Sequence, residues 1–242
     1  GVTNITGLSD NLIATGATVK GGSGVDSITG GAGADVITGN AGGDTLLGGT
    51  GNDNISGGAG ADTIEGEAGA DILTGGAGDN IFTLDDDHST EAAMDSITDF
   101  TAGAADADFD TLAFAGTAVV SADIAIGAAH SVTDHTTDTD STVSAYVTNG
   151  IILLTGTDAG NVDTLAEWID IAEDVAVNGW TDDANAVETA TIGFNFGGDT
   201  YVLYADDEVE DGTVVTESIV KLTGVTATAV STTEASDTVH VS

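Results

Sequence analysis

The sequence predicts a mainly β protein built on a coil of short, stacked, parallel strands. A nine-residue repeat fills residues 21–83, and 20 of the 35 glycines lie within it. Each repeat is too short to hold itself together and too rich in glycine to bury much surface, so it is stable only when stacked on its neighbours. From residue 84 onward glycine becomes rarer and 31 of the 41 acids are found, which predicts a second module.

Seven consecutive units make up the repeat: GGSGVDSIT, GGAGADVIT, GNAGGDTLL, GGTGNDNIS, GGAGADTIE, GEAGADILT and GGAGDNIFT. Positions one and four are always glycine, and position eight is always apolar. Position six is aspartate in six units and Asn80 in the last. We expect each unit to form a six-residue turn and a three-residue strand whose apolar residue points inward. A flexible linker would have no reason to keep that apolar position.

Two units make one 18-residue coil, so the turns alternate between two edges and each unit lies over the unit two further along. Successive coils are expected about 4.8 Å apart, the spacing of paired strands. Carboxylates stacked this closely repel one another, so we expect a cation between them. The position-six aspartates then line two edges, with Asp26, Asp44 and Asp62 on one and Asp35, Asp53 and Asp71 on the other.

The donor atoms in these turns select the ion. Aspartate carboxylates and turn carbonyls form a hard, oxygen-only set, which favours calcium over zinc or copper. Magnesium fits poorly because it takes few protein ligands in a tight octahedron. Glycines at fixed places allow the left-handed backbone angles that turn carbonyls toward an ion. The chain has no cysteine, which excludes disulfides and thiolate metal sites.

The units resemble the G-G-x-G-x-D-x-U-x nonapeptide of the RTX (repeats-in-toxin) family. The resemblance implies a right-handed parallel β-roll over residues 21–83 with one Ca²⁺ between each pair of turns on the same edge, hence about five ions or more. The chain departs from the family pattern at Asn40 and Glu67 in position two and at Asp79-Asn80 in the last unit. Asn80 removes a charge and weakens the last site unless Asp79 takes its place.

The expected calcium ligands are turn acids and turn glycines. The acids of the repeats are Asp26, Asp35, Asp44, Asp53, Asp62, Asp71 and Asp79. The glycines are Gly22, Gly24, Gly31, Gly33, Gly42, Gly49, Gly51, Gly58, Gly60, Gly69, Gly76 and Gly78. Asp99 and Asp110 lie in a stretch that resembles the one closing many RTX rolls, and they are further candidates. Solvated acids on a capping strand pair are an equally good interpretation of these two.

Two regions flank the roll. Residues 1–20 are expected to form an N-terminal cap or a degenerate repeat, and residues 84–242 a β-rich assembly or secretion module with one or two helices. Strand-like runs at 191–196 and 200–204 are joined by a Gly-Gly-Asp hairpin turn, and a third run follows at 218–222.

A helix is expected after Thr164, because Thr164 and Glu167 form a capping box and apolar residues follow at helical spacing. Packing of this helix on the adjacent sheet, with Trp168 in the core, is favoured over binding of a partner or a secretion receptor.

The charge balance excludes several functions. With 41 Asp+Glu against 2 Lys+Arg, the formal net charge is −39. Nucleic-acid binding is excluded because neutralising phosphates needs lysine and arginine. Direct docking on anionic lipid is disfavoured for the same reason. No apolar run is long enough to span a bilayer, so no direct membrane insertion is expected.

Catalysis is not expected. The chain has neither an H-E-x-x-H zinc motif nor a G-x-S-x-G nucleophile elbow, and its four histidines are scattered.

Two hypotheses of function remain. The C-terminal sequence FNFGGDTYVLYADDE…SIVKLTGV resembles the C-terminal modules of RTX proteins that type I transporters export from Gram-negative bacteria. These exported proteins include surface-layer proteins. In the favoured hypothesis the chain is an extracellular or cell-surface structural protein. It folds in calcium after export by a type I transporter and self-assembles, as a homo-oligomer, into a surface layer or filament. In the alternative it is the calcium-binding folding and secretion module of a larger exported enzyme, toxin or adhesin.

Overall fold

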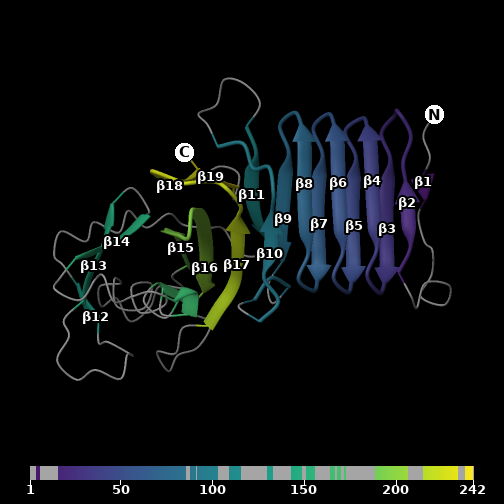
Figure 1. The fold of residues 1–242 in the computed structure, drawn as a ribbon. Helices are drawn as coiled ribbons and strands as arrows, with labels where there is room; N and C mark the ends of the chain where they lie inside the picture. The colour runs from purple at the N-terminus through teal and green to yellow at the C-terminus, as the bar shows by residue number, and fades with distance from the viewer. Residues whose placement is uncertain are drawn as a thin grey trace.

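The computed structural model describes residues 4–5, 16–85, 88–90, 92–102, 109–115, 130–132, 143–148, 151–155, 164–166, 168–169, 172, 189–206, 215–233 and 238–241. The fold is mainly β, as the repeat predicts. Within the described residues the strands form one eight-stranded and one eleven-stranded sheet. The strands of the roll stack along one axis, and the C-terminal strands lie at one end of it (Figure 1).

Strands of the roll alternate between the two sheets. Each pairs in parallel with the strand two further along, at an offset of 18 residues, so that Ile28 lies opposite Leu46 and Ile37 opposite Ile55. The predicted 18-residue coil is therefore confirmed. The first sheet contains β1 (Asn4–Ile5), β3 (Ser27–Ala32), β5 (Thr45–Thr50), β7 (Thr63–Ala68) and β9 (Ile81–Asp85). The second contains β2 (Thr18–Lys20), β4 (Val36–Ala41), β6 (Asn54–Ala59) and β8 (Ile72–Ala77).

The position-eight residues form the core of the roll. They stack in two columns, one per sheet, and each of the seven is at most 1% exposed. Burying one such side chain contributes about 1.5–3 kcal/mol, so the columns supply most of the apolar stabilisation that the repeats possess. The columns are Ile28, Leu46, Ile64 and Phe82 in one sheet, and Ile37, Ile55 and Leu73 in the other.

The strands from β3 to β8 are six residues long, twice the length predicted. The additional residues are positions one to three of the following unit, which continue the ladder between coils, as where Gly31 lies opposite Gly49. Their backbone N–H and C=O groups need partners this close to the core. The turn therefore shrinks to positions four to six, for example Gly33 to Asp35 between β3 and β4.

Both sheets of the roll continue beyond the repeats. In one, β10 (Asp95–Ile97) pairs in parallel with β8, and Ile97 lies opposite Leu73. In the other, β11 (Thr111–Ala115) pairs in parallel with β9, and Leu112 lies opposite Phe82. The coil is longer here, because these partners are separated by more than 18 residues in the sequence. Ile97 and Leu112 are fully buried and extend the two apolar columns.

C-terminal strands add to both sheets. Strand β17 (Val215–Leu222) pairs in parallel with β10, and β16 (Asp199–Asp206) and β15 (Thr189–Phe196) follow it antiparallel. The same sheet ends in β14 (Ile151–Thr155), β13 (Val143–Thr148) and β12 (His130–Val132). The other sheet adds β19 (Thr238–Val241) beside β11, then β18 (Val230–Thr233).

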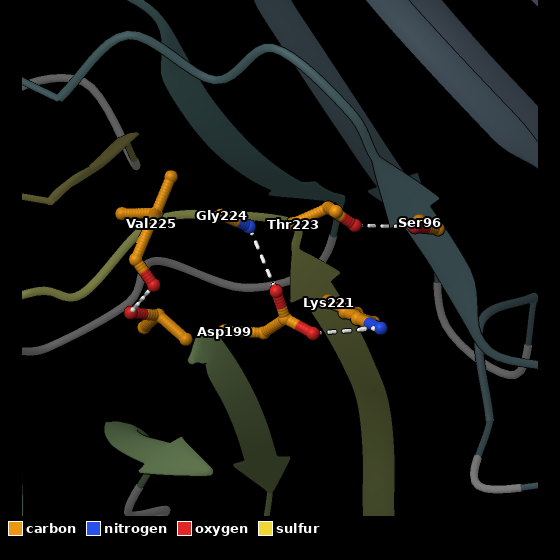
Figure 2. A network of polar contacts seen from close by, with 7 residues as sticks. Ser96, Asp199, Lys221, Thr223, Gly224 and Val225 are labelled. Atoms are coloured by element: carbon orange, nitrogen blue, oxygen red, sulfur yellow. Dashed lines mark hydrogen bonds and ion pairs between the residues drawn. The ribbon is translucent and has the colours of Figure 1, made fainter. Parts of the chain in front are cut away.

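The predicted hairpin is present, with β15 and β16 joined at Gly197 and Gly198, both at positive φ. Its turn is tied to the segment after β17 (Figure 2). Asp199 accepts a hydrogen bond from the Gly224 N–H (2.7 Å) and forms an ion pair with Lys221 (2.8 Å). The Ser96 and Thr223 hydroxyls are 2.9 Å apart and link this segment to β10.

The described residues after Thr164 include helical positions, as the sequence predicts, whereas Glu167 of the capping box lies outside them. Ile169 and Ala172 are buried, and the Trp168 ring stacks on Phe194 with centroids 5.6 Å apart. Among the described residues, no helix is long and apolar enough to cross a membrane.

Candidate calcium sites in the turns

The six position-six aspartates line the two edges as the coil predicts, and each is at most 2% exposed. Their backbone and side chains form a ladder along each edge. The Asp26 N–H donates to Asp44 Oδ1 (2.8 Å), and the Asp44 N–H donates to Asp62 Oδ1 (2.7 Å). On the other edge the Asp35 and Asp53 N–H groups donate in the same way to the next aspartate. One oxygen of Asp44, Asp53, Asp62 and Asp71 therefore binds the backbone of the turn one coil earlier.

The second oxygen of these carboxylates is the unusual feature. Within the described structure it is buried and has no hydrogen-bond partner in five of the six aspartates, namely Asp35, Asp44, Asp53, Asp62 and Asp71. A buried carboxylate oxygen without a partner costs several kcal/mol when it is charged. Five such atoms in one small roll indicate a missing positive charge beside each.

A backbone carbonyl lies close to four of these five oxygens, those of Asp35, Asp44, Asp53 and Asp62. At Gly30, the point that a Cβ would occupy lies 2.5 Å from Asp35 Oδ2 and 2.4 Å from the Gly48 carbonyl oxygen. The same pairing of a carboxylate with the position-one carbonyl of the next coil recurs at Gly21, Gly39, Gly48 and Gly57. A cation bound by such a carboxylate oxygen would therefore have a carbonyl oxygen close by as a further ligand.

Burial shifts the acidity of these groups. It raises the pKa of Asp53, and it raises the pKa values of Asp62 and Asp71 to about 6, despite the backbone N–H groups that stabilise the charged forms. Neighbouring aspartates raise them further. The charged forms of these aspartates are therefore less stable here than in water, and a bound cation would stabilise them.

The donor set fits calcium. No three His, Cys, Asp or Glu side chains of the described chain converge on one point. Each site must therefore combine carboxylate oxygens from two coils with backbone carbonyls, and Ca²⁺ accepts six to eight such oxygens in flexible geometry. Zinc would require histidine or thiolate ligands, which these turns lack.

The turn glycines provide the backbone for this arrangement. Ten of the twelve predicted glycines have positive φ, and only Gly22 and Gly24 in the first unit do not. The carbonyls that face the aspartate oxygens belong instead to position-one glycines, which the sequence prediction did not include. Calcium ligation by the predicted glycines stays a prediction.

At the end of the roll, Asp99 and Asp110 have different partners. Asp99 accepts hydrogen bonds from the Gly75 and Gly76 N–H groups, both at 2.8 Å, so it binds the backbone of β8. Asp110 continues one ladder, because its Oδ1 accepts from the Asn80 N–H at 3.1 Å. Its Oδ2 accepts from the Thr101 N–H at 2.7 Å. Burial raises the pKa of Asp110 above its usual value.

Asp79 and Asn80 occupy the last repeat. Asp79 accepts a hydrogen bond from the Phe109 N–H at 3.2 Å. The Asn80 amide takes the place of the unpartnered carboxylate oxygen and donates to the Gly78 carbonyl (3.0 Å) and to Asp110 Oδ1 (2.9 Å). Ligand roles for Asp79, Asp99 and Asp110 remain predictions.

Asp95 is the residue that sequence reasoning missed. It continues the other ladder, accepting from the Asp71 N–H at 3.0 Å, and it is 2% exposed. Burial and the adjacent Asp71 raise its pKa to about 8. Its own N–H donates to the Ser89 hydroxyl (2.8 Å), which donates to the Ile219 carbonyl (2.6 Å) of β17. The signal was present, since Asp95-Ser96-Ile97 has the D-x-apolar order of the repeats.

Comparison with known proteins supports the calcium interpretation. Residues 14–46 and 47–82 match the family model described as RTX calcium-binding nonapeptide repeat (4 copies). The roll is thus built of repeats of the RTX calcium-binding type. No match was found among curated proteins.

One solved structure is similar in part. It is the solution structure of the AlgE6R3 subunit from the Azotobacter vinelandii mannuronan C5-epimerase, 22% identical, covering 93% of this chain and 77% of that one, with a TM-score of 0.36. A TM-score this low supports no argument about function.

Proposed function

We propose that the chain is an extracellular structural protein whose roll folds when calcium enters its turns after export, and that it then assembles with copies of itself into a surface layer or filament. Bound calcium supplies the positive charge that the stacked carboxylates need. The observation that carries the calcium part of the proposal is the set of five buried carboxylate oxygens without partners, four of which lie close to a backbone carbonyl.

Calcium binding and folding are coupled in this proposal. Without the ion, the desolvated carboxylates oppose the stacking that the apolar columns favour. With the ion, binding free energy becomes folding free energy. Extracellular calcium modules bind at about 10⁻⁴–10⁻³ M, so the roll would stay open at cytosolic calcium and close outside the cell. An open chain suits passage through a type I transporter.

Self-assembly is the finer part of the proposal. Contacts between copies cannot rest on salt bridges, because the chain has 2 basic residues against 41 acids. One of the two, Lys221, is already paired with Asp199 within the chain. Calcium bridges and apolar contacts are the remaining means by which copies of such an acidic protein could associate.

The first experiment compares the protein in millimolar CaCl₂ with the protein in EGTA by circular dichroism, light scattering and electron microscopy. Calcium is expected to convert an expanded monomer into a β-rich protein and then into sheets or filaments. A compact monomer in calcium would reject self-assembly and favour the folding and secretion module of a larger exported protein. A roll that is fully folded in EGTA at neutral pH would reject calcium-dependent folding itself.

A further inference from the structure

The outer face of the second sheet differs in charge from the rest of this acidic chain. Along β2, β4, β6, β8 and β10 the residues beside the buried column point away from the core, because side chains alternate between the two faces of a strand. One row of these outward residues contains Thr18, Val36, Asn54, Ile72 and Ser96, a second contains Lys20, Thr38, Ser56, Thr74 and Thr98, and a third contains Asn40, Gly58 and Gly76. None of them is an acid, although the chain has 41 acids, and we call this set the acid-free face.

Both basic residues of the chain lie on this side of the sheet. Lys20 is exposed in β2, at one end of the acid-free face. Lys221 in β17 lies opposite Ser96 and pairs with Asp199 (Figure 2). Lys20 forms no ion pair with any residue that the structure describes, so the acid-free face carries a positive charge of its own.

The outer face of the first sheet provides the contrast. There Glu65 and Glu67 lie in β7, in the rows of outward residues. Ile81 on this face has the same repeat position as Ile72 on the acid-free face, and the two are 39% and 47% exposed. The two faces therefore share their backbone, their spacing and an exposed isoleucine, and they differ in charge.

The acid-free face is open, whereas its continuation beyond the roll is covered. Past β17 the same row of the sheet runs to Tyr201 and then to Phe194. The Trp168 ring stacks on Phe194 with centroids 5.6 Å apart, and Tyr201 is only 5% exposed. Over the roll, by contrast, Val36 is 44% exposed. A further layer can cover a sheet face of this kind, because it has branched apolar side chains and no acids to desolvate.

We propose that a second copy of the chain packs on the acid-free face, sheet against sheet, and that this contact is the first step of self-assembly. The inference rests on the proposed self-assembly and names the surface that carries it. Two copies with a net charge of −39 repel each other wherever acids line the contact, and this face contributes none. A cationic partner would bind the acidic surfaces instead, and one lysine is too few to hold a polyanion.

The size and the charges of the face define how the two copies pack. Its five strands, 4.8 Å apart and about 20 Å long, span about 500 Å². A pair of copies therefore buries about 1,000 Å², the lower limit for a specific interface. A two-fold axis along β6, the central strand, lays β2 of one copy over β10 of the other. This arrangement separates the two Lys20 side chains and brings each toward the end of the other copy where Asp99 and Asp199 lie.

The charge of the face is tested by Thr38→Asp, with Thr29→Asp as the matched control. Both threonines occupy position nine of a repeat and point outward, and both changes add one negative charge. Only Thr38 lies on the acid-free face. Sedimentation velocity in millimolar CaCl₂ measures the dissociation constant of the dimer. It rises about tenfold or more in Thr38→Asp and stays near the wild-type value in Thr29→Asp.

The apolar part of the contact is tested by Ile72→Ser, with Ile81→Ser as its control on the opposite face. Ile72→Ser weakens the dimer several-fold, because less apolar surface is removed from water on association, whereas Ile81→Ser leaves it unchanged. Circular dichroism at the same calcium concentration verifies that each variant is folded, so a lost dimer is not a lost fold.

Two outcomes would overturn the proposal. Equal dissociation constants in Thr38→Asp and Thr29→Asp would show that the copies meet elsewhere, and self-assembly itself would stand. A wild type that folds in calcium but remains monomeric would show that the occupant of this face is not a second copy, and the proposed self-assembly would fail with it.

Discussion

The last turn of the roll and the turns before it share one backbone and one ladder, but their polar atoms are satisfied differently. In five of the six earlier turns, those of Asp35, Asp44, Asp53, Asp62 and Asp71, the aspartate uses one oxygen for the ladder and leaves the other buried without a partner. In the last repeat Asn80 makes the same ladder bond, and its amide also donates to Gly78 and Asp110. The amide hydrogens occupy the place that an ion must fill elsewhere.

This difference indicates how the proposed dependence of the roll on calcium would arise. Stacking and apolar burial are the same in both regions, and Phe82 beside Asn80 is as buried as Ile64 beside Asp62. In the proposed function, the exchange of an oxygen for an NH₂ group separates a turn whose polar atoms are satisfied from one that would require a cation. The proposed calcium dependence therefore resides in single atoms at position six.

The largest effect is expected from removing one carboxylate in the middle of a ladder. Asp44→Ala takes a ligand from the gaps shared with Asp26 and with Asp62, and it leaves the buried Asp26 N–H without its acceptor. Two sites are lost and the calcium midpoint of folding, followed by circular dichroism, rises roughly tenfold or more. The exposed neighbour Thr45→Ala is the control. An unchanged midpoint in Asp44→Ala would contradict stacked sites.

Protonation of the buried aspartates at low pH should stabilise the calcium-free roll and so substitute in part for bound calcium. The folded pKa values of Asp62 and Asp71 are about 6 and that of Asp95 about 8, above the usual 3.8, so the folded state binds protons that the unfolded state has released. In EGTA, stability is thus retained at low pH and lost as pH rises toward 8. Urea unfolding at pH 5 and pH 8 measures this.

Millimolar calcium should remove that dependence or reverse it, because protons and calcium compete for the same oxygens. Calcium-free stability that increases from pH 5 to pH 8 would show that these carboxylates are not desolvated.

Changing one position-six aspartate to asparagine should give its turn the hydrogen bonds that Asn80 makes in the last turn. In Asp62→Asn the new NH₂ group can reach the carbonyl of its own turn and the Asn80 side chain. The calcium-free protein should gain about 1 kcal/mol of stability at pH 7 and bind at least one ion fewer, as measured by urea unfolding and calorimetry. The reverse change, Asn80→Asp, should lose stability in EGTA and gain it back in calcium. Equal calcium requirements in all three proteins would contradict the comparison.

The most local effect is expected where the roll meets the C-terminal strands. Ser89→Ala removes the hydroxyl that joins the Asp95 N–H to the Ile219 carbonyl, at a cost of about 1–2 kcal/mol. Amide exchange at Val220 in β17 should accelerate, while the calcium midpoint of the repeats stays the same. The exposed Ser23→Ala is the control. Unchanged exchange in β17 would mean that the strand pairing alone holds this junction.

The nine-residue period was sufficient to predict the coil, the inward column from Ile28 to Phe82 and the two edges of aspartates, because each follows from spacing alone. The strand length was underestimated because the glycines at positions one and two have low strand propensity, yet the stacked coils pair positions one to three. Asp95 was missed because it is separated from Asp71 by 24 residues, outside the 18-residue period. Which carbonyl faces each carboxylate depends on backbone angles that the sequence pattern leaves open.

The ends of the two ladders limit how the number of repeats can change over evolution. The final donors, the N–H groups of Asp95 and Asp110, bond to Ser89 and Thr101 rather than to another carboxylate. Inserting one nine-residue unit would move every later turn to the opposite edge and deliver β10 and β11 to the wrong sheets. Inserting two units would preserve both terminations. Related rolls that keep this ending should therefore differ in length by multiples of 18 residues, so gene duplication would extend them in pairs of units.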